Sequence, residues 1–226
     1  MSEVKVIKIN ESIFAQNDRS AEIIRSRLTA QGTLFLNFMS SPGSGKTTTL
    51  IALINRLKDQ LNIGEMDVDI ESSLDAQRVA DMTGIRSLQI HNGGLCHIDA
   101  DMTSRALVEY DTKGLDLLIL ENIGNLVCPA EFDTGADLKV MILSVPEGDD
   151  KPLKYPLMFK VTDCILVNKI DTDEIFDFNL QKLERNVAPL NEHAKIIPIS
   201  AFTGSGVENW LVYLREKIFE WNYSCH

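Results

Sequence analysis

Two patterns of hydrophobic positions alternate along the chain. Apolar residues at helical spacing predict a helix over residues 11–29 and another over Lys46–Leu57. Short continuous apolar runs, such as Leu117–Leu120 and Val140–Leu143, are typical of strands buried on both faces of a parallel sheet. Further strands are predicted at about residues 34–39, 65–69, 86–90, 116–120, 138–145, 163–167 and 195–199, and further helices near 75–82, 98–110, 177–187 and 207–220.

This alternation of strands and helices predicts the fold class. It indicates a doubly wound α/β fold, in which helices flank both faces of a mostly parallel sheet. A helical segment over residues 1–30 is expected to precede it. The stretch from Pro146 to Pro156 carries glycine and proline and is predicted to be a loop.

Composition narrows the classes of function. The 226 residues, 44% of them hydrophobic, suit one α/β domain with a sizeable core. A net charge of −11 offers no counterion-release affinity for nucleic acid, and no run approaches the 18 apolar residues of a membrane span. The first residues lack a signal pattern and the four cysteines are sparse, so a cytoplasmic protein with reduced thiols is expected.

A glycine-rich segment lies between a predicted strand and a predicted helix. It matches the phosphate-loop pattern G-x-x-x-x-G-K-[ST], except that Ser40 stands at the first glycine. Gly43 and Gly45 allow backbone amides to turn toward phosphate oxygens at the helix N-terminus. Lys46 is expected to bridge the β- and γ-phosphates, and the Thr47 hydroxyl to hold Mg²⁺.

Two acidic residues at strand ends are candidates to complete a magnesium site. Asp69 ends one predicted strand, and Glu121 ends another, with Gly124 three residues later. Active sites of open α/β sheets lie at the carboxyl ends of strands, which favours a role at the γ-phosphate for both acids and for the Gly124 N–H. The alternative for either acid is an ordinary solvated carboxylate.

A later segment has the composition of a guanine site. A predicted strand ends in Asn168-Lys169-Ile170-Asp171, where the Asp171 carboxylate can accept both N1–H and N2–H₂ of guanine. Lys169 can cover the base, and Asn168 can tie this loop to the phosphate loop. Ser200 and Ala201 follow the last predicted strand and fit a loop whose backbone amide contacts guanine O6. GTP is therefore favoured over ATP, and residues 31–226 are predicted to be a single P-loop GTPase domain.

Thiol and imidazole groups suggest a second kind of site. Cys96 and His97 are adjacent, and Cys128 lies shortly after Glu121. These groups are ligands for Zn²⁺ or Ni²⁺, but three residues need a water, a carboxylate such as Asp99 or Asp101, or a second subunit to complete a tetrahedral set. The alternative is that the cysteines are small buried hydrophobic residues. Because Cys128 follows Glu121 closely in the chain, a change of nucleotide state could move a metal ligand.

The other two cysteines are not expected to form a site. Cys164 lies within a predicted strand and is assigned to the core. Cys225 and His226 end the sequence and are interpreted as a frayed tail.

These motifs together resemble one family, the hydrogenase nickel-incorporation GTPases of the HypB type. The resemblance covers roughly residues 10 to 221, and the Cys-His and Glu-Asn-x-Gly-Asn-Leu-Val-Cys-Pro segments are its most specific parts. The matching stretches are Ser40–Thr48, Asp75–Arg78, Cys96–Ala100, Glu121–Ala130, Glu147–Pro156, Asn168–Asp171 and Ser200–Ala201.

The resemblance implies a G3E-type GTPase that dimerises with nucleotide, GTP or GDP, and Mg²⁺. It implies nickel or zinc held by Cys96, His97 and Cys128 at the subunit interface, and delivery to the [NiFe]-hydrogenase large-subunit precursor with a small zinc-bearing partner, HypA. It also implies that Ser44 and Thr48 contribute to the nucleotide site. No cysteine precedes Cys96 and no histidine precedes His91, so a separate N-terminal nickel store is not expected.

Three other functions remain open at this point. A urease-type nickel GTPase usually carries Cys-Pro-His, which is missing here, whereas Cys128-Pro129 favours the hydrogenase branch. A metal-binding adaptor that merely keeps a nucleotide fold is opposed by the intact Lys46, Thr47, Glu121 and Asp171. A generic GTPase with incidental cysteines is the third. No arginine finger or positioned glutamine is evident from the sequence, so intrinsic hydrolysis is expected to be slow.

Overall fold

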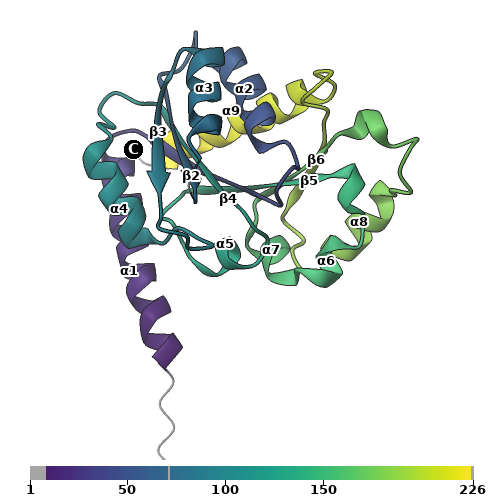
Figure 1. Cartoon of the computed structure of the whole chain (residues 1–226), viewed down its shortest axis with the longest axis horizontal. Helices are drawn as coiled ribbons and strands as arrows, with labels where there is room; N and C mark the ends of the chain where they lie inside the picture. Colours follow the sequence, from purple (N-terminus) through teal and green to yellow (C-terminus); the bar gives the residue numbers. More distant parts are fainter. Residues whose placement is uncertain (1–8, 71, 225–226) are drawn as a thin grey trace, which may run out of the picture.

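The computed structural model describes residues 9–70 and 72–224. Within them, seven strands form one sheet in the order β3-β2-β4-β1-β5-β6-β7 (Figure 1), and every neighbouring pair is parallel. The predicted doubly wound α/β fold is therefore confirmed. The strands are β1 (Leu34–Ser40), β2 (Ile63–Asp69), β3 (Arg86–His91), β4 (Leu117–Gly124), β5 (Leu138–Ser144), β6 (Cys164–Asn168) and β7 (Lys195–Pro198).

Helices cover both faces of the sheet (Figure 1). Helices α2, α3 and α9 lie on one face, and α1, α4, α7 and α8 lie on the other. The longer helices are α1 (Ile9–Ala30), α2 (Lys46–Leu57), α3 (Leu74–Thr83), α4 (Ala100–Glu109), α8 (Leu180–Val187) and α9 (Val207–Ser224). The predicted N-terminal helix is thus confirmed, and it packs along α4.

Alternate residues of each strand face opposite layers of the core. In β5, Val140 and Ile142 join the core under α2 and α9, whereas Met141 and Leu143 join the core under α7 and α8. All four side chains are completely buried. This two-sided burial is the physical reason why the strands appear in the sequence as unbroken apolar runs.

The chain connectivity places a crevice at the carboxyl end of β1. After β1 the chain builds β2, β3 and β4 on one side of it, then crosses to β5, β6 and β7 on the other side. In open α/β sheets, ligands bind where the strand order diverges in this way. The phosphate loop follows β1 directly, so it lies in that crevice.

The stretch from Pro146 to Pro156 is not wholly a loop, and this prediction was wrong in part. It contains the 3₁₀ turn η1 (Val145–Glu147) and the short helix α6 (Lys151–Lys154), and α7 (Pro156–Val161) begins at its end. Proline is compatible with the first turn of a helix, because the N–H that it lacks has no intrahelical partner there. The prolines in this stretch therefore begin short helices.

Two further short elements complete the fold: α5 (Cys128–Glu131) after β4, and the 3₁₀ turn η2 (Ile170–Thr172) after β6. Of the helices in the described ranges, none has both the length and the apolar character that crossing a membrane requires.

Candidate nucleotide and metal sites

The phosphate loop forms one wall of a cavity of about 470 Å³, called here the phosphate cavity. Gly43 and Gly45 adopt left-handed φ angles of 74° and 98°, which a side chain rarely tolerates. A Cβ atom on Gly45 would lie 2.5 Å from Asn168 Nδ2, so this glycine also permits a close approach of the two loops. The lining residues are Pro42, Gly43, Gly45, Lys46, Thr47, Thr48, Asp69, Ile70, Asp75, Arg78, Glu121, Ile123 and Gly124.

The serine at the first position of the phosphate-loop pattern contacts the lysine of that pattern. Lys46 Nζ donates a hydrogen bond of 3.0 Å to Ser40 Oγ, and Ser40 is fully buried. The hydroxyl therefore anchors the ammonium group of Lys46, a residue that also lines the phosphate cavity. A glycine at this position could not make that contact.

The hydroxyl and carboxylate predicted to hold Mg²⁺ are paired with each other. Thr47 Oγ1 donates a 2.8 Å hydrogen bond to Glu121 Oε1, and Asp69 lines the same cavity. Glu121 is 3% exposed, and its other oxygen, Oε2, is buried without a hydrogen-bond partner among the described residues. Hydroxyl and carboxylate oxygens are the ligands that Mg²⁺ prefers, so these residues fit the ion.

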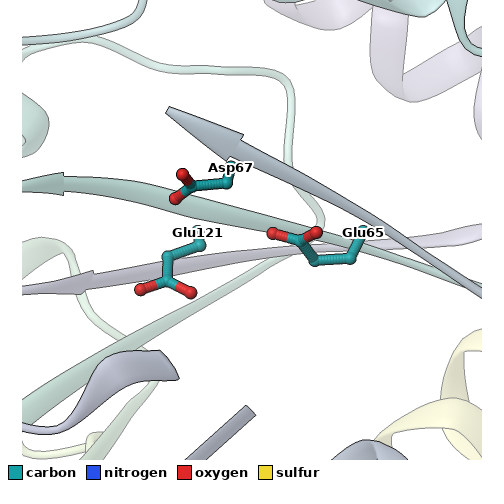
Figure 2. A group of neighbouring side chains, drawn as sticks. All are labelled: Glu65, Asp67 and Glu121. Carbon is teal, nitrogen blue, oxygen red and sulfur yellow. The ribbon is translucent and has the colours of Figure 1, made fainter. Parts of the chain in front are cut away.

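Glu65 and Asp67 lie beside Glu121 and were not predicted from the sequence to belong to a site. One carboxylate oxygen from each of the three residues lies within 4.8 Å of the other two, and these side chains of β2 and β4 (Figure 2) are called here the acidic cluster. Burial is the main cause that raises the pKa of Glu65 to about 9, that of Glu121 to about 8 and that of Asp67 to about 6. Alternating acids in β2 share one face of the strand, and this was the signal available in the sequence.

The predicted guanine loop is joined to the phosphate loop by Asn168. Its Nδ2 donates to the Ser44 carbonyl at 2.9 Å, and its Oδ1 accepts from the Ala201 N–H at 3.0 Å. Lys169 has a left-handed φ of 64°, and its Nζ donates to the Gly43 carbonyl at 2.7 Å. One asparagine therefore links the phosphate loop to both predicted base-binding loops.

A second cavity, of about 230 Å³, adjoins these loops and is called here the base cavity. Asp171 is exposed at this cavity, where its carboxylate is free to meet a planar base. Gly45 and Thr48 line both this cavity and the phosphate cavity, so the two are adjacent. The base cavity is lined by Gly45, Thr48, Asn168, Lys169, Asp171, Thr172, Ser200, Ala201 and Phe202.

Cys96, His97 and Cys128 are brought together and are called here the thiol site. The Sγ atoms of Cys96 and Cys128 are 2.7 Å apart, and Cys96 Sγ is 3.8 Å from His97 Nδ1. The hydrogen bond that Cys96 donates to Cys128 is the main cause that raises the pKa of the Cys96 thiol. The His97 ring stacks on Phe132 at a centroid distance of 3.9 Å.

The exposure of the thiol site separates the two interpretations of its cysteines. Cys96 is exposed and Cys128 half-buried, so neither is a small hydrophobic residue in the core. Two sulfurs and one imidazole nitrogen suit Ni²⁺ or Zn²⁺. Asp99 caps the N-terminus of α4 by accepting from the Met102 N–H at 2.8 Å, which gives its carboxylate a structural role.

The remaining cysteines are Cys164 and Cys225. Cys164 is completely buried in β6, so its assignment to the core is confirmed. Cys225 and His226 lie outside the described residues.

Asp75 and Arg78 also line the phosphate cavity, and the sequence alone assigned them no role. Both lie on α3, which follows β2 and faces the phosphate loop. Arg78 is exposed and, with Lys46, is one of two basic residues among those that line the cavity. The Asp75–Arg78 stretch was recognisable as part of the family resemblance, but only the fold brings it to the cavity.

Comparison with known proteins agrees with this geometry. The model of the family "CobW/HypB/UreG, nucleotide-binding domain" matches residues 35–198. Hydrogenase maturation factor HypB of Rhizobium leguminosarum bv. viciae is 42% identical, over 95% of this chain and 71% of the relative. The hydrogenase/urease maturation factor HypB of Helicobacter hepaticus is 37% identical, over 98% and 92%.

A solved structure extends the similarity to three dimensions. The crystal structure of HypB from Helicobacter pylori in complex with nickel superposes with a TM-score of 0.84 at 37% identity, covering 91% of this chain and 96% of that one. Sequence identity at this level over nearly the whole length, together with the same fold, indicates shared ancestry. The chain belongs to the HypB family of hydrogenase maturation factors and carries that family's nucleotide-binding domain.

Proposed function

We propose that this protein binds and hydrolyses GTP with Mg²⁺, and that the GTP cycle controls delivery of nickel to the [NiFe]-hydrogenase large-subunit precursor. The observation that carries the proposal is the β4 segment. Glu121, at the phosphate cavity, contacts Thr47, and the same strand continues through Gly124 to α5, which begins with Cys128 of the thiol site. A change at the γ-phosphate therefore has a short covalent route to a metal ligand.

The base cavity supports GTP as the nucleotide. The exposed Asp171 carboxylate offers two acceptor oxygens, which match the two donors on the Watson–Crick edge of guanine. The backbone N–H of Ala201 already donates to Asn168. Guanine O6 would therefore be contacted by a neighbouring amide of the Ser200 loop, or by the Ala201 amide after this loop rearranges on binding.

The residues of the phosphate cavity support hydrolysis. The backbone amides of Gly43 and Gly45 and the Lys46 ammonium would bind phosphate oxygens, while Thr47, Asp69 and Glu121 would hold Mg²⁺. When bound, Mg²⁺ supplies charge neutralisation at the β- and γ-phosphates. Arg78 supplies a second positive charge at the mouth of the cavity, where it can stabilise charge that develops during phosphoryl transfer.

Nickel is the proposed cargo, and zinc is the alternative ion for the same ligands. Cys96, His97 and Cys128 provide three donors, which leaves a coordination position for a ligand from a second subunit. Leu95 and Val127, next to the two cysteines, are 44% and 50% exposed. Exposed apolar side chains around the thiol site support its role as a contact between the two subunits of a homodimer.

The other parts of the proposal concern partners and place. A cytoplasmic homodimer that acts with a HypA-type zinc-bearing partner fits a maturation factor with reduced surface thiols. The helical segment predicted over residues 1–30 is described from Ile9 onward, as α1, and its first eight residues lie outside the described residues. In this proposal residues 31–226 form the GTPase domain. The β1 strand begins at Leu34, which agrees with a boundary near residue 31.

One experiment tests the link between nucleotide and metal. Light scattering after size exclusion, with and without a GTP analogue and Ni²⁺, should show a dimer that both ligands promote. Lys46→Ala should abolish the nucleotide effect, and Cys96→Ala or Cys128→Ala should abolish nickel uptake in competition with a chromophoric chelator. Cys164→Ala removes a buried thiol and serves as the control. Nickel uptake by Cys96→Ala and Cys128→Ala equal to wild type would refute the thiol site.

A second candidate function is nickel delivery to urease, which the name of the Helicobacter hepaticus relative favours. The chemistry of the thiol site is the same for both targets. Nickel transfer from the loaded protein to the hydrogenase precursor and to urease apoprotein, measured side by side, separates the two functions.

A further inference from the structure

The acidic cluster has the geometry of a cation site separate from the thiol site. Asp67 of β2 pairs in register with Glu121 of β4, and Glu65 lies two residues earlier on the same face of β2 (Figure 2). One carboxylate oxygen from each residue lies within 4.8 Å of the other two. The cluster occupies the sheet face that α2 and α3 cover, where Ile63 and Ile119 continue the same rows as apolar side chains.

The carboxylates of the cluster are buried and incompletely paired. Glu65, Asp67 and Glu121 are 0%, 4% and 3% exposed. Glu65 Oε1, Asp67 Oδ2 and Glu121 Oε2 each have no hydrogen-bond partner within residues 9–70 and 72–224. The other oxygens of the two glutamates are satisfied by Ser87 and Thr47. Each of the three residues therefore offers one buried, unpaired acceptor oxygen.

The charge of this cluster is only partly balanced. The field of the Lys46 ammonium group lowers the pKa of both Asp67 and Glu121, but Lys46 Nζ donates its hydrogen bond to Ser40. Burying carboxylates without a partner is costly, and a cation or bound protons must offset the charge. The same burial raises the pKa of all three carboxyl groups.

We propose that Glu65, Asp67 and Glu121 bind a divalent cation of the Mn²⁺ or Ca²⁺ type, in addition to the Mg²⁺ that accompanies the nucleotide. Ca²⁺ binds oxygen at about 2.3–2.6 Å, so oxygens that share it lie at most about 5 Å apart, and the three oxygens of the cluster meet that limit. Mg²⁺ needs about 2.0–2.1 Å in near-ideal octahedral geometry, whereas Ca²⁺ accepts a more flexible arrangement of its oxygen ligands. Ni²⁺ and Zn²⁺ prefer the sulfur and imidazole ligands of the thiol site.

Such a cation would act on the nucleotide site through Glu121. This carboxylate would bind the cation with Oε2 while Oε1 accepts from Thr47. The cation would keep Glu121 ionised and fixed in the orientation that holds the Thr47 hydroxyl. The inference shares Glu121 with the proposed Mg²⁺ site, so its test is done without nucleotide.

The test is a Mn²⁺ titration of the nucleotide-free full chain, with free Mn²⁺ measured by electron paramagnetic resonance. The Cys96→Ser, Cys128→Ser double variant serves as background, so that the thiol site does not contribute. This background should bind one equivalent of Mn²⁺, and added Glu65→Gln should weaken that binding at least 10-fold. Glu109→Gln, which changes an exposed glutamate on α4, is the matched control and should bind Mn²⁺ as the background does.

Thermal unfolding provides the second measurement and verifies that the variants fold. At a 100-fold excess over its Kd, Mn²⁺ should raise the unfolding temperature of the background by roughly 5–10 °C and that of Glu65→Gln by much less. If Glu65→Gln does not fold, Asp67→Asn replaces it. No uptake of Mn²⁺ by the background, or equal uptake after Glu65→Gln, would overturn the inference and assign the charge balance to protons. Neither result bears on GTP binding or nickel uptake.

Discussion

The hydrogen bonds of Asn168 lead to a quantitative prediction. This side chain is 3% exposed and joins Ser44 of the phosphate loop to Ala201 of the loop after β7. Replacing it with alanine removes both hydrogen bonds and leaves a carbonyl and an N–H without their partner. At about 0.5–1.5 kcal/mol per hydrogen bond, Asn168→Ala should lower the free energy of unfolding by about 1–3 kcal/mol.

The effect should appear in both stability and affinity. For a chain of this length, a loss of 2 kcal/mol corresponds to a fall in unfolding temperature of about 4–8 °C. GDP binding should weaken by about tenfold or more, because 1.4 kcal/mol is a factor of ten and both loops contact the nucleotide. Urea unfolding gives the stability, and titration with a fluorescent GDP analogue gives the affinity.

The control for this prediction is Asn55→Ala. Asn55 is also an asparagine with one side-chain hydrogen bond, to the Met82 carbonyl at 3.2 Å, but that bond is exposed and remote from the nucleotide loops. Asn55→Ala should change the free energy of unfolding by less than about 0.5 kcal/mol and leave GDP affinity unaltered. If Asn168→Ala behaves like this control, the bridge does not organise the nucleotide site.

Three further predictions follow from the cavities and the acidic cluster. Asp171→Asn should weaken GTP binding and favour xanthosine nucleotides, because an amide donor meets the carbonyl that xanthine carries at position 2; unchanged selectivity in competition titrations would argue against the base cavity. Arg78→Ala should lower single-turnover GTP hydrolysis by about 10²-fold or more with GTP affinity nearly retained, whereas Gln77→Ala should not; equal loss of affinity and rate would assign Arg78 to ground-state binding. Glu65 and Glu121 have raised pKa values, about 9 and 8, so between about pH 5 and pH 8 the folded state binds more protons than the unfolded state. Stability of the nucleotide- and cation-free protein should therefore fall as pH rises across that range, and Glu65→Gln should flatten the curve of unfolding temperature against pH; a rise in stability with pH would contradict this assignment.

The elements of the fold were largely accessible from the sequence, and the exceptions have clear causes. Helix α2 begins and ends at the predicted residues, Lys46 and Leu57, because its apolar stripe and the glycine before it are local signals. Helix α6 was missed because proline and glycine in the Pro146–Pro156 stretch are common to loops and to first helical turns. Local composition does not separate those two cases.

Within the candidate sites, the local motifs were identifiable and the long-range contacts were not. The P-loop and Asn168–Asp171 patterns could be recognised because neighbouring residues supply most of each motif. The tie between Asn168 and Ser44 joins residues 124 positions apart, and the placement of Arg78 at the phosphate cavity depends on the packing of α3. A pattern along the chain carries no direct information on such distances.

Sequence alone thus determined the fold class, the guanine-type nucleotide motifs and the identity of the thiol and imidazole groups, because each is encoded by residues within a short segment. The tertiary structure decided that Cys96 and Cys128 meet at 2.7 Å and remain at the surface. It also decided that Glu65 and Asp67 are buried against Glu121. In the sequence, the alternation of these two acids places them on one face of a strand but does not show that this face is buried. Only the pairing of β2 with β4, beneath α2 and α3, buries these two carboxylates beside Glu121. Burial is what raises their pKa values.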